Sequence, residues 1–280
     1  MNAIEIKNLT KTYPGFCLQN LNLTLPSGCI MGIVGENGAG KSTTIRLIMD
    51  MIERDEGTIT IMGMDNRENI RLLKEETGVV LDEVGFPECM DAKQVNKMMK
   101  GTYKNWDEHL FEDYLKKLSV PDNKSFRAFS KGMKMKLGIA VALSHSPKLL
   151  ILDEATGGLD PVVRDEVLEI FEEFTRDESH SVLISSHIVS DLEKICDYIA
   201  FLHKGKLLLC EEKDRLKEEY GLLHCTSDFL SELSEKAVFG KRESAYGVEA
   251  LVRRDAVPET VELCSVGIED IFLFMVKGDR

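Results

Sequence analysis

The sequence predicts an α/β fold with a mostly parallel sheet, and three of its stretches lead to this prediction. Residues 30–34 form an apolar run of strand length, which a glycine-rich loop and apolar residues at helical spacing follow. Residues 149–153 and 181–187 are apolar runs of the same kind, and an amphipathic helix pattern over 161–174 separates them. Strands that alternate with helices form parallel sheets, whose functional groups gather at the carboxyl ends of the strands.

Two further units join this core. The first 30 residues alternate between apolar and polar side chains, which predicts an N-terminal antiparallel β subdomain. Lys41 and Asp153 are separated by far more than the roughly 30 residues that a single strand–helix–strand crossover needs. Residues 91–147 fill this interval and have a helical pattern, so we expect an inserted helical subdomain there.

The pattern changes again towards the C-terminus. Residues 237–244 and 247–254 alternate as short strands do, and residues 267–278 have the pattern of a closing helix. We therefore divide the chain into a main domain, residues 1–222, and a small α+β C-terminal appendage, residues 223–280.

The composition is typical of a soluble globular protein, with 43% hydrophobic and 30% charged residues among 280. The net charge of −13 argues against a nucleic-acid partner, because that affinity comes mainly from basic side chains on phosphates. No apolar run approaches the roughly 18 residues that span a bilayer, and the N-terminus lacks the apolar segment of a signal peptide. We expect the chain to stay in the cytoplasm.

A phosphate-binding loop is predicted at residues 35–43, which read GENGAGKST between a strand and a helix. Its glycines let backbone N–H groups converge on the β-phosphate of a nucleotide, and the following helix offers its positive end. Lys41 is expected to reach the β- and γ-phosphates, and Ser42 to coordinate Mg²⁺. The candidate nucleotide-binding residues of the loop are Gly35, Asn37, Gly38, Gly40, Lys41, Ser42 and Thr43.

Two acidic residues follow one another at the end of the apolar run 149–153. Asp153 is placed to anchor Mg²⁺ directly or through water. Glu154 is a candidate general base that polarises the attacking water, and the alternative is a second exposed acid without a catalytic role. A kinase or a GTPase does not need this pair of acids. We therefore predict an ATPase with ATP and Mg²⁺ as its cofactors.

Four motifs, GENGAGKST, FSKGM, LLILDEATGGLDP and SSH, occur in an order and spacing that resemble the ATP-binding cassette family over residues 3–222. The resemblance implies a P-loop NTPase core. It also implies that Tyr13 stacks on adenine and that Ser130 and Gly132, in the signature motif FSKGM, contact phosphate. The alternative for Tyr13 is an ordinary core tyrosine.

The same resemblance gives roles to three more residues. It places Asp160 in the loop that communicates across a dimer, and His187 in contact with the γ-phosphate, although a lone histidine is more often structural. At the position of a glutamine that couples Mg²⁺ to the attacking water, this chain has Asp82, followed by Glu83. A carboxylate there can bind the metal or orient water, and the alternative is a solvated loop acid. The signature departs from the family pattern as well, because Lys131 replaces a glycine and Met133 replaces a glutamine.

Longer stretches narrow the resemblance to ATP subunits of bacterial ABC-2-type exporters, which are linked with antibiotic resistance and with export of amphipathic peptides such as phenol-soluble modulins. It implies a homodimer that powers a separate transmembrane permease from the cytoplasmic face of the membrane. Two alternatives stay open: a soluble cassette protein acting on ribosomes or DNA, and a regulatory ATP-binding module without turnover. We predict that Phe86 and Met90 line a groove that receives a short cytoplasmic helix of the permease, and the alternative is that they pack the core of the helical subdomain.

Overall fold

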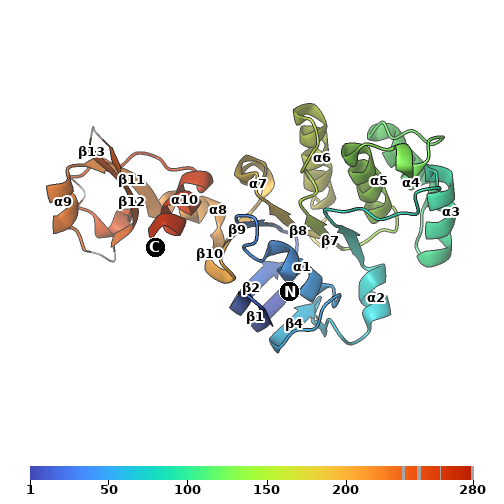
Figure 1. Ribbon diagram of the computed structural model, residues 1–280, viewed down its shortest axis with the longest axis horizontal. Helices are drawn as coiled ribbons and strands as arrows, with labels where there is room; N and C mark the ends of the chain where they lie inside the picture. Colours follow the sequence, from blue (N-terminus) through green and yellow to red (C-terminus); the bar gives the residue numbers. More distant parts are fainter. Residues whose placement is uncertain (235–236, 245–246, 259, 279–280) are drawn as a thin grey trace.

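The computed structural model describes residues 1–234, 237–244, 247–258 and 260–278. The molecule is elongated, and a central α/β unit lies between a group of helices on one side and a C-terminal unit on the other (Figure 1). Among the described residues, no helix combines the length and the apolar character that crossing a membrane requires.

The central sheet consists of six strands, β3 (Ile30–Val34), β6 (Thr77–Val80), β7 (Leu149–Asp153), β8 (Ser181–Ser186), β9 (Tyr198–His203) and β10 (Lys206–Glu212). Their order is β10-β9-β3-β8-β7-β6. All neighbouring pairs are parallel except β9 with the edge strand β10. β3, β7 and β8 are buried along their whole length, as central strands of a parallel sheet between helices are. The mostly parallel sheet is therefore confirmed, with β8 ending one residue before the predicted end at 187.

A second, antiparallel sheet contains the N-terminus. Its strands are β1 (Asn2–Tyr13), β2 (Phe16–Pro26), β4 (Glu56–Ile61) and β5 (Met64–Asp65), in the order β2-β1-β4-β5. In β2 the side chains of Leu21, Leu23 and Leu25 are buried, and the residues between them are exposed. This period of two is what the sequence shows. The sheet extends beyond the first 30 residues, because β4 returns to pair with β1 after α1 (Lys41–Ile48), and α2 (Ile70–Glu75) follows β5.

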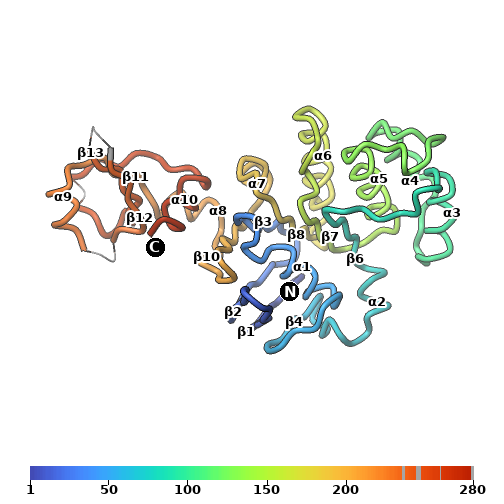
Figure 2. Tube along the Cα trace, in the orientation of Figure 1, coloured from blue at the N-terminus to red at the C-terminus, as the bar shows by residue number. Residues whose placement is uncertain are grey.

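The helical group occupies the interval for which the sequence predicts a helical subdomain. It contains α3 (Ala92–Thr102), α4 (Glu108–Lys117) and α5 (Lys131–Leu143). Each helix follows a residue whose side chain accepts a hydrogen bond from the backbone N–H three positions later, namely Asp91, Asp107 and Ser130. The segment after β6 runs from the central sheet out to α3 (Figure 2).

Phe86 and Met90 lie on that connecting segment. Both side chains are half-buried and pack against the core of the helical group. The ring of Phe86 meets the ring of Phe126 edge-on, with 5.6 Å between the centroids. This packing agrees with the alternative interpretation, in which the two residues belong to the core of the subdomain.

The C-terminal unit is built on three antiparallel strands in the order β11-β13-β12, with β11 (Tyr220–Cys225), β12 (Val238–Ser244) and β13 (Gly247–Arg253). Its helices are α9 (Ser227–Glu232) and α10 (Ile268–Gly278), and α8 (Lys213–Glu219) leads into it. The predicted boundary at residue 222 falls inside β11, because Tyr220 and Gly221 already pair with β13. The unit also packs against the central domain, where the Phe272 ring lies 5.4 Å from that of Phe201.

Candidate nucleotide-binding site

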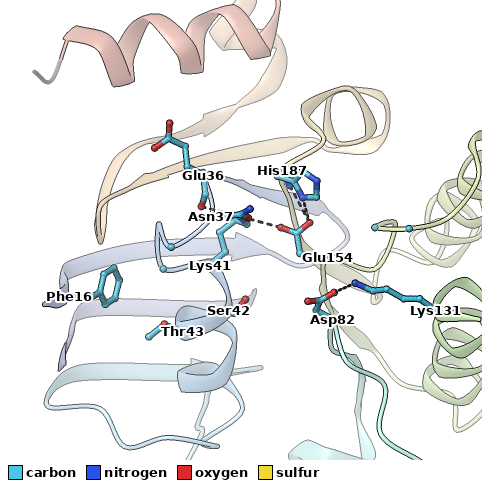
Figure 3. A pocket seen from close by; sticks show the side chains of 14 residues that line it. Phe16, Glu36, Asn37, Lys41, Ser42, Thr43, Asp82, Lys131, Glu154 and His187 are labelled. Atoms are coloured by element: carbon cyan, nitrogen blue, oxygen red, sulfur yellow. Dashed lines mark hydrogen bonds and ion pairs between the residues drawn. The ribbon is translucent and has the colours of Figure 1, made fainter. Parts of the chain in front are cut away.

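A cavity of about 580 Å³ opens above the carboxyl ends of the central strands. Its wall combines the loop before α1, the loop after β6, the start of α5 and the segments that follow β7 and β8. In the close view, the side chains of Lys41, Glu154 and His187 point toward one another, and Asp82 and Lys131 form a second pair beside them (Figure 3). The wall residues are Phe16, Glu36, Asn37, Gly38, Gly40, Lys41, Ser42, Thr43, Asp82, Lys131, Glu154, Gly157, Gly158 and His187.

The loop before α1 needs glycine at two kinds of position. Gly38 and Gly40 have φ angles of +81° and +114°, a region that residues with a side chain rarely adopt. At Gly35, a Cβ atom would lie only 2.5 Å from the backbone oxygen of Leu202. The loop is therefore held close to β9, and α1 begins at its end with free N–H groups for an anion.

Lys41 is buried in this wall, with only 6% of its surface exposed. Its ammonium donates hydrogen bonds to the backbone oxygens of Gly35 at 2.7 Å and Glu36 at 3.3 Å. The same nitrogen lies 3.2 Å from Oε1 of Glu154. A positive charge is thus held at the phosphate loop and balanced by a carboxylate.

Glu154 contacts groups from several segments of the cavity wall. Its Oε2 lies 2.6 Å from Nδ1 of His187, and its backbone N–H donates to the backbone oxygen of Ser185 at 3.1 Å. The φ angle of Glu154 is +53°, a left-handed backbone conformation that is uncommon for a residue with a side chain. The backbone turn after β7 aims this carboxylate into the cavity, between Lys41 and His187.

The predicted Mg²⁺ ligands offer oxygen atoms of the type this ion prefers. Ser42 lies in the cavity wall. Asp153 is buried at the end of β7, behind the wall, where the Ser185 hydroxyl donates to its Oδ1 at 2.6 Å. In the described part of the chain, no cluster of three or more His, Cys, Asp or Glu could hold a metal by itself. This donor set fits Mg²⁺, which binds one or two protein oxygens together with nucleotide phosphates and water.

Asp82, not Glu83, lines this cavity, which agrees with the predicted register of the loop after β6. Its Oδ1 accepts a hydrogen bond from the Lys131 ammonium at 2.7 Å. The hydrogen bond to Asp82 is the main reason that the pKa of Lys131 is raised above its usual range. Two of the departures from the family pattern, Asp82 and Lys131, are therefore in direct contact.

Tyr13 does not line the cavity, in contrast to the predicted adenine-stacking position. Its side chain is 39% exposed, and the Lys11 ammonium lies 5.5 Å from its ring centre. Phe16, on the other strand of the same hairpin, is in the wall instead, and its ring tip would be 3.1 Å from a Cβ atom at Gly40. The hairpin thus brings Phe16 over the phosphate loop and leaves Tyr13 further out. Sequence reasoning missed Phe16, although a second aromatic residue three positions after Tyr13 was a usable signal.

Ser130, Gly132 and Asp160 also lie outside this cavity. The oxygens of Ser130 and Asp160 cap helices: they accept from the backbone N–H groups of Met133 and Val163, both at 3.2 Å. Asp160 caps α6 (Pro161–Phe174), which begins with a proline. These three residues are therefore not brought to the phosphate loop of their own chain.

Comparison with known proteins identifies the family. The ABC transporter family model matches residues 18–157, half of the chain. A lantibiotic transport ATP-binding protein, SrtF of Streptococcus pyogenes, is 36% identical over 75% of this chain and 91% of its own length. The chain belongs to the ABC transporter family. The bacitracin transport ATP-binding protein BcrA of Enterococcus faecalis is 35% identical over 74% of this cassette protein and 68% of its own length.

A solved ATP-binding subunit of an ABC transporter superposes on the cassette with a TM-score of 0.71 and 26% identity, covering 77% of this chain and 92% of the other. The predicted family, the α/β fold with its P-loop NTPase core and the ATPase class are thereby confirmed. The cassette accordingly binds ATP, and the loop of residues 35–43 is the cavity wall suited to its phosphates.

Proposed function

We propose that this cassette hydrolyses ATP with Glu154 as general base, and that a homodimer of it drives a separate membrane-spanning exporter. The observation that carries the proposal is the convergence of Lys41, Glu154 and His187 in one cavity wall. The cargo we propose is a peptide or an antibiotic-like amphipathic compound, which the names of the lantibiotic and bacitracin relatives support.

The triphosphate is held by charge and by backbone donors. The Lys41 ammonium already lies against the phosphate loop, so it can move from the Glu154 carboxylate to the β- and γ-phosphates without crossing the cavity. Ser42 and Asp153 would hold Mg²⁺, Asp82 in the same cavity wall would bind the ion or its water, and the ion would neutralise charge on the phosphates.

Hydrolysis requires a carboxylate that is free to polarise water. When the γ-phosphate takes over Lys41 and His187, both partners of Glu154 are drawn away, and its oxygens become available to the attacking water. The water oxygen then bonds to the γ-phosphorus, its proton passes to Glu154, and the bond to the bridging oxygen breaks. His187 and Lys41 stabilise the charge that develops on the γ-phosphate oxygens.

The homodimer proposal is supported by residues that lie outside the cavity. Ser130 and Gly132 do not line the cavity of their own chain, although Lys131 between them does, and the Ser130 oxygen caps α5. A two-fold dimer would bring the signature of each copy to the phosphate loop of the other. Asp160, at the start of α6, would then lie near the same interface.

The membrane part of the exporter is proposed as a separate permease, with the cassette bound at the cytoplasmic face of the membrane. The transport names of the relatives support this arrangement. A soluble cassette acting on ribosomes or DNA is less well supported, since the net charge of −13 disfavours contacts with nucleic-acid phosphates.

The test is the variant Glu154→Gln, compared with Glu166→Gln on the exposed side of α6. The first should keep ATP binding and lose at least about a hundredfold in turnover, the typical contribution of a general base. The second should match the unaltered protein. Turnover of Glu154→Gln within about threefold of the unaltered protein would show that Glu154 is not the base.

A further inference from the structure

The ion pair between Asp82 and Lys131 joins two parts of the site that are distant in sequence. Asp82 follows the parallel strand β6, and Lys131 is the first residue of α5. Their side chains approach to 2.7 Å at the edge of the nucleotide cavity, and both belong to its wall (Figure 3). The contact therefore ties the signature helix to the loop that faces the phosphates.

A third segment takes part in this junction. The methylene groups of Lys131 lie beside Gly158, since a Cβ atom at that glycine would be 3.6 Å from Cδ of the lysine. Gly158 belongs to the segment after Glu154 and has a φ angle of +76°, which favours glycine. Lys131 is thus positioned by packing along its stem and by Asp82 at its tip.

Lysine is an unfavourable choice for the first turn of a helix. The N-terminus of α5 carries a partial positive charge, and no acidic residue lies in its first turn. The carboxylate of Asp82 supplies the missing negative charge from another segment. The side chain of Asp82 is 48% exposed and that of Lys131 is 60% exposed. Exposed ion pairs contribute at most about 1 kcal/mol to the free energy of unfolding, so this contact can be made and broken.

We propose that Lys131 is a positioning residue that holds Asp82 while the cassette lacks nucleotide, and that Mg²⁺ with ATP must take Asp82 from it. The two positive charges compete for one carboxylate. Binding of the magnesium nucleotide then releases α5 from the loop after β6, and the strength of the pair sets the Mg²⁺ concentration that nucleotide binding requires. This inference rests on the proposed function of Asp82.

The experiment measures binding of a fluorescent ATP analogue to the full chain over a range of Mg²⁺ concentrations, without reference to turnover. In Lys131→Gln, the Mg²⁺ concentration for half-maximal binding should fall by about fivefold, the ratio equivalent to the roughly 1 kcal/mol of an exposed pair. Lys131→Arg preserves the pair and should behave as the unaltered protein does. Asp82→Asn should raise the Mg²⁺ requirement, and adding Lys131→Gln to it should have no further effect.

The matched control is Lys134→Gln, which removes the same charge from the same helix, where Lys134 lies over the Phe126 ring and not against Asp82. Lys131→Gln within twofold of the unaltered protein, or an equal shift in Lys134→Gln, would overturn the proposal. If the unaltered protein binds the analogue with no response to Mg²⁺, the proposed role of Asp82 fails as well. If it does not bind the analogue at all, the proposed ATPase function fails.

Discussion

Glu154 has partners on both sides of its cavity, whereas Ser130 directs its side-chain oxygen to the first turn of its own helix. The phosphate-loop half of the site is thus assembled within one chain. The signature half, carried by α5, is positioned by caps and by the pair of Lys131 with Asp82. On the proposed homodimer, the difference would mean that one chain holds two half-sites that face different nucleotides.

The largest expected effect comes from mixing two inactive variants, which tests whether the half-sites of two copies complete one nucleotide site. Lys41→Ala should lose nucleotide binding, because it removes the cation at the phosphate loop. Ser130→Asp should keep the cap of α5, since aspartate also caps helices, but should place a carboxylate against the phosphates of the other copy. In a mixed dimer one site then has both halves intact, so a mixture should recover about a quarter of the ATPase activity.

In the control, the Lys41→Ala chain is replaced by a chain that carries both Lys41→Ala and Ser130→Asp. A mixture of this chain with the Ser130→Asp chain should recover no ATPase activity. ATPase assays on equal mixtures, with sizing to confirm mixed dimers, make the measurement. Mixed dimers without recovered activity would mean that each site is completed within its own chain.

The two halves also differ in how far the sequence predicts them. The phosphate loop, Asp153 and Glu154 follow from spacing within short segments, because each backbone turn is determined by neighbouring residues. The partners of Glu154 come from segments remote in the sequence, and the resemblance supplied the role of His187. The contact of Asp82 with Lys131 was not foreseen, because a surface ion pair leaves no periodic signal in the sequence.

The other differences between the sequence predictions and the structure also arise from contacts that the local sequence does not determine. Tyr13 and Phe16 are three positions apart on one hairpin, and only the way it leans on Gly40 decides which ring reaches the cavity. The predicted boundary at residue 222 falls within β11, because that strand is defined by its pairing with β13, a segment remote in the sequence. Phe86 and Met90 are apolar on a loop, a composition that does not separate a docking surface from a core edge.

A smaller effect on ATP binding is expected from the aromatic residue that would stack on adenine in the phosphate-loop half of the site. Phe16→Ala should weaken ATP binding by about fivefold, because aromatic stacking contributes about 1 kcal/mol. Tyr13→Ala should have less effect, since its ring is directed to solvent and Lys11. Equilibrium binding of ATP to both variants makes the measurement. A larger loss for Tyr13→Ala would mean that the hairpin rearranges to bring Tyr13 over the base.

The smallest expected effect concerns the helical group that carries the signature half. His145 follows α5, stacks on Tyr103 with 4.0 Å between ring centres, and is fully buried. Burial lowers the pKa of His145 below its ordinary value of 6.5. Above pH 6.5 the residue is neutral in both the folded and the unfolded chain, so it does not affect the pH dependence there.

Below pH 6.5 the unfolded chain binds a proton that folded His145 resists, so this residue lowers the free energy of unfolding by at most about 1.4 kcal/mol per pH unit. His145→Phe retains an aromatic ring against Tyr103 and removes the titration, so its urea midpoint should fall less between pH 7.5 and about 5.5. The variant should be less stable than the unaltered protein at pH 7.5, because neutral His145 can donate one hydrogen bond, to the Val141 or the Thr77 oxygen, each 3.4 Å from a ring nitrogen, and phenylalanine donates none. Exposed His109→Gln is the matched control. An equal fall with pH in His145→Phe and in the control would show that the acid sensitivity arises elsewhere, and that the half-site on α5 is not loosened through His145.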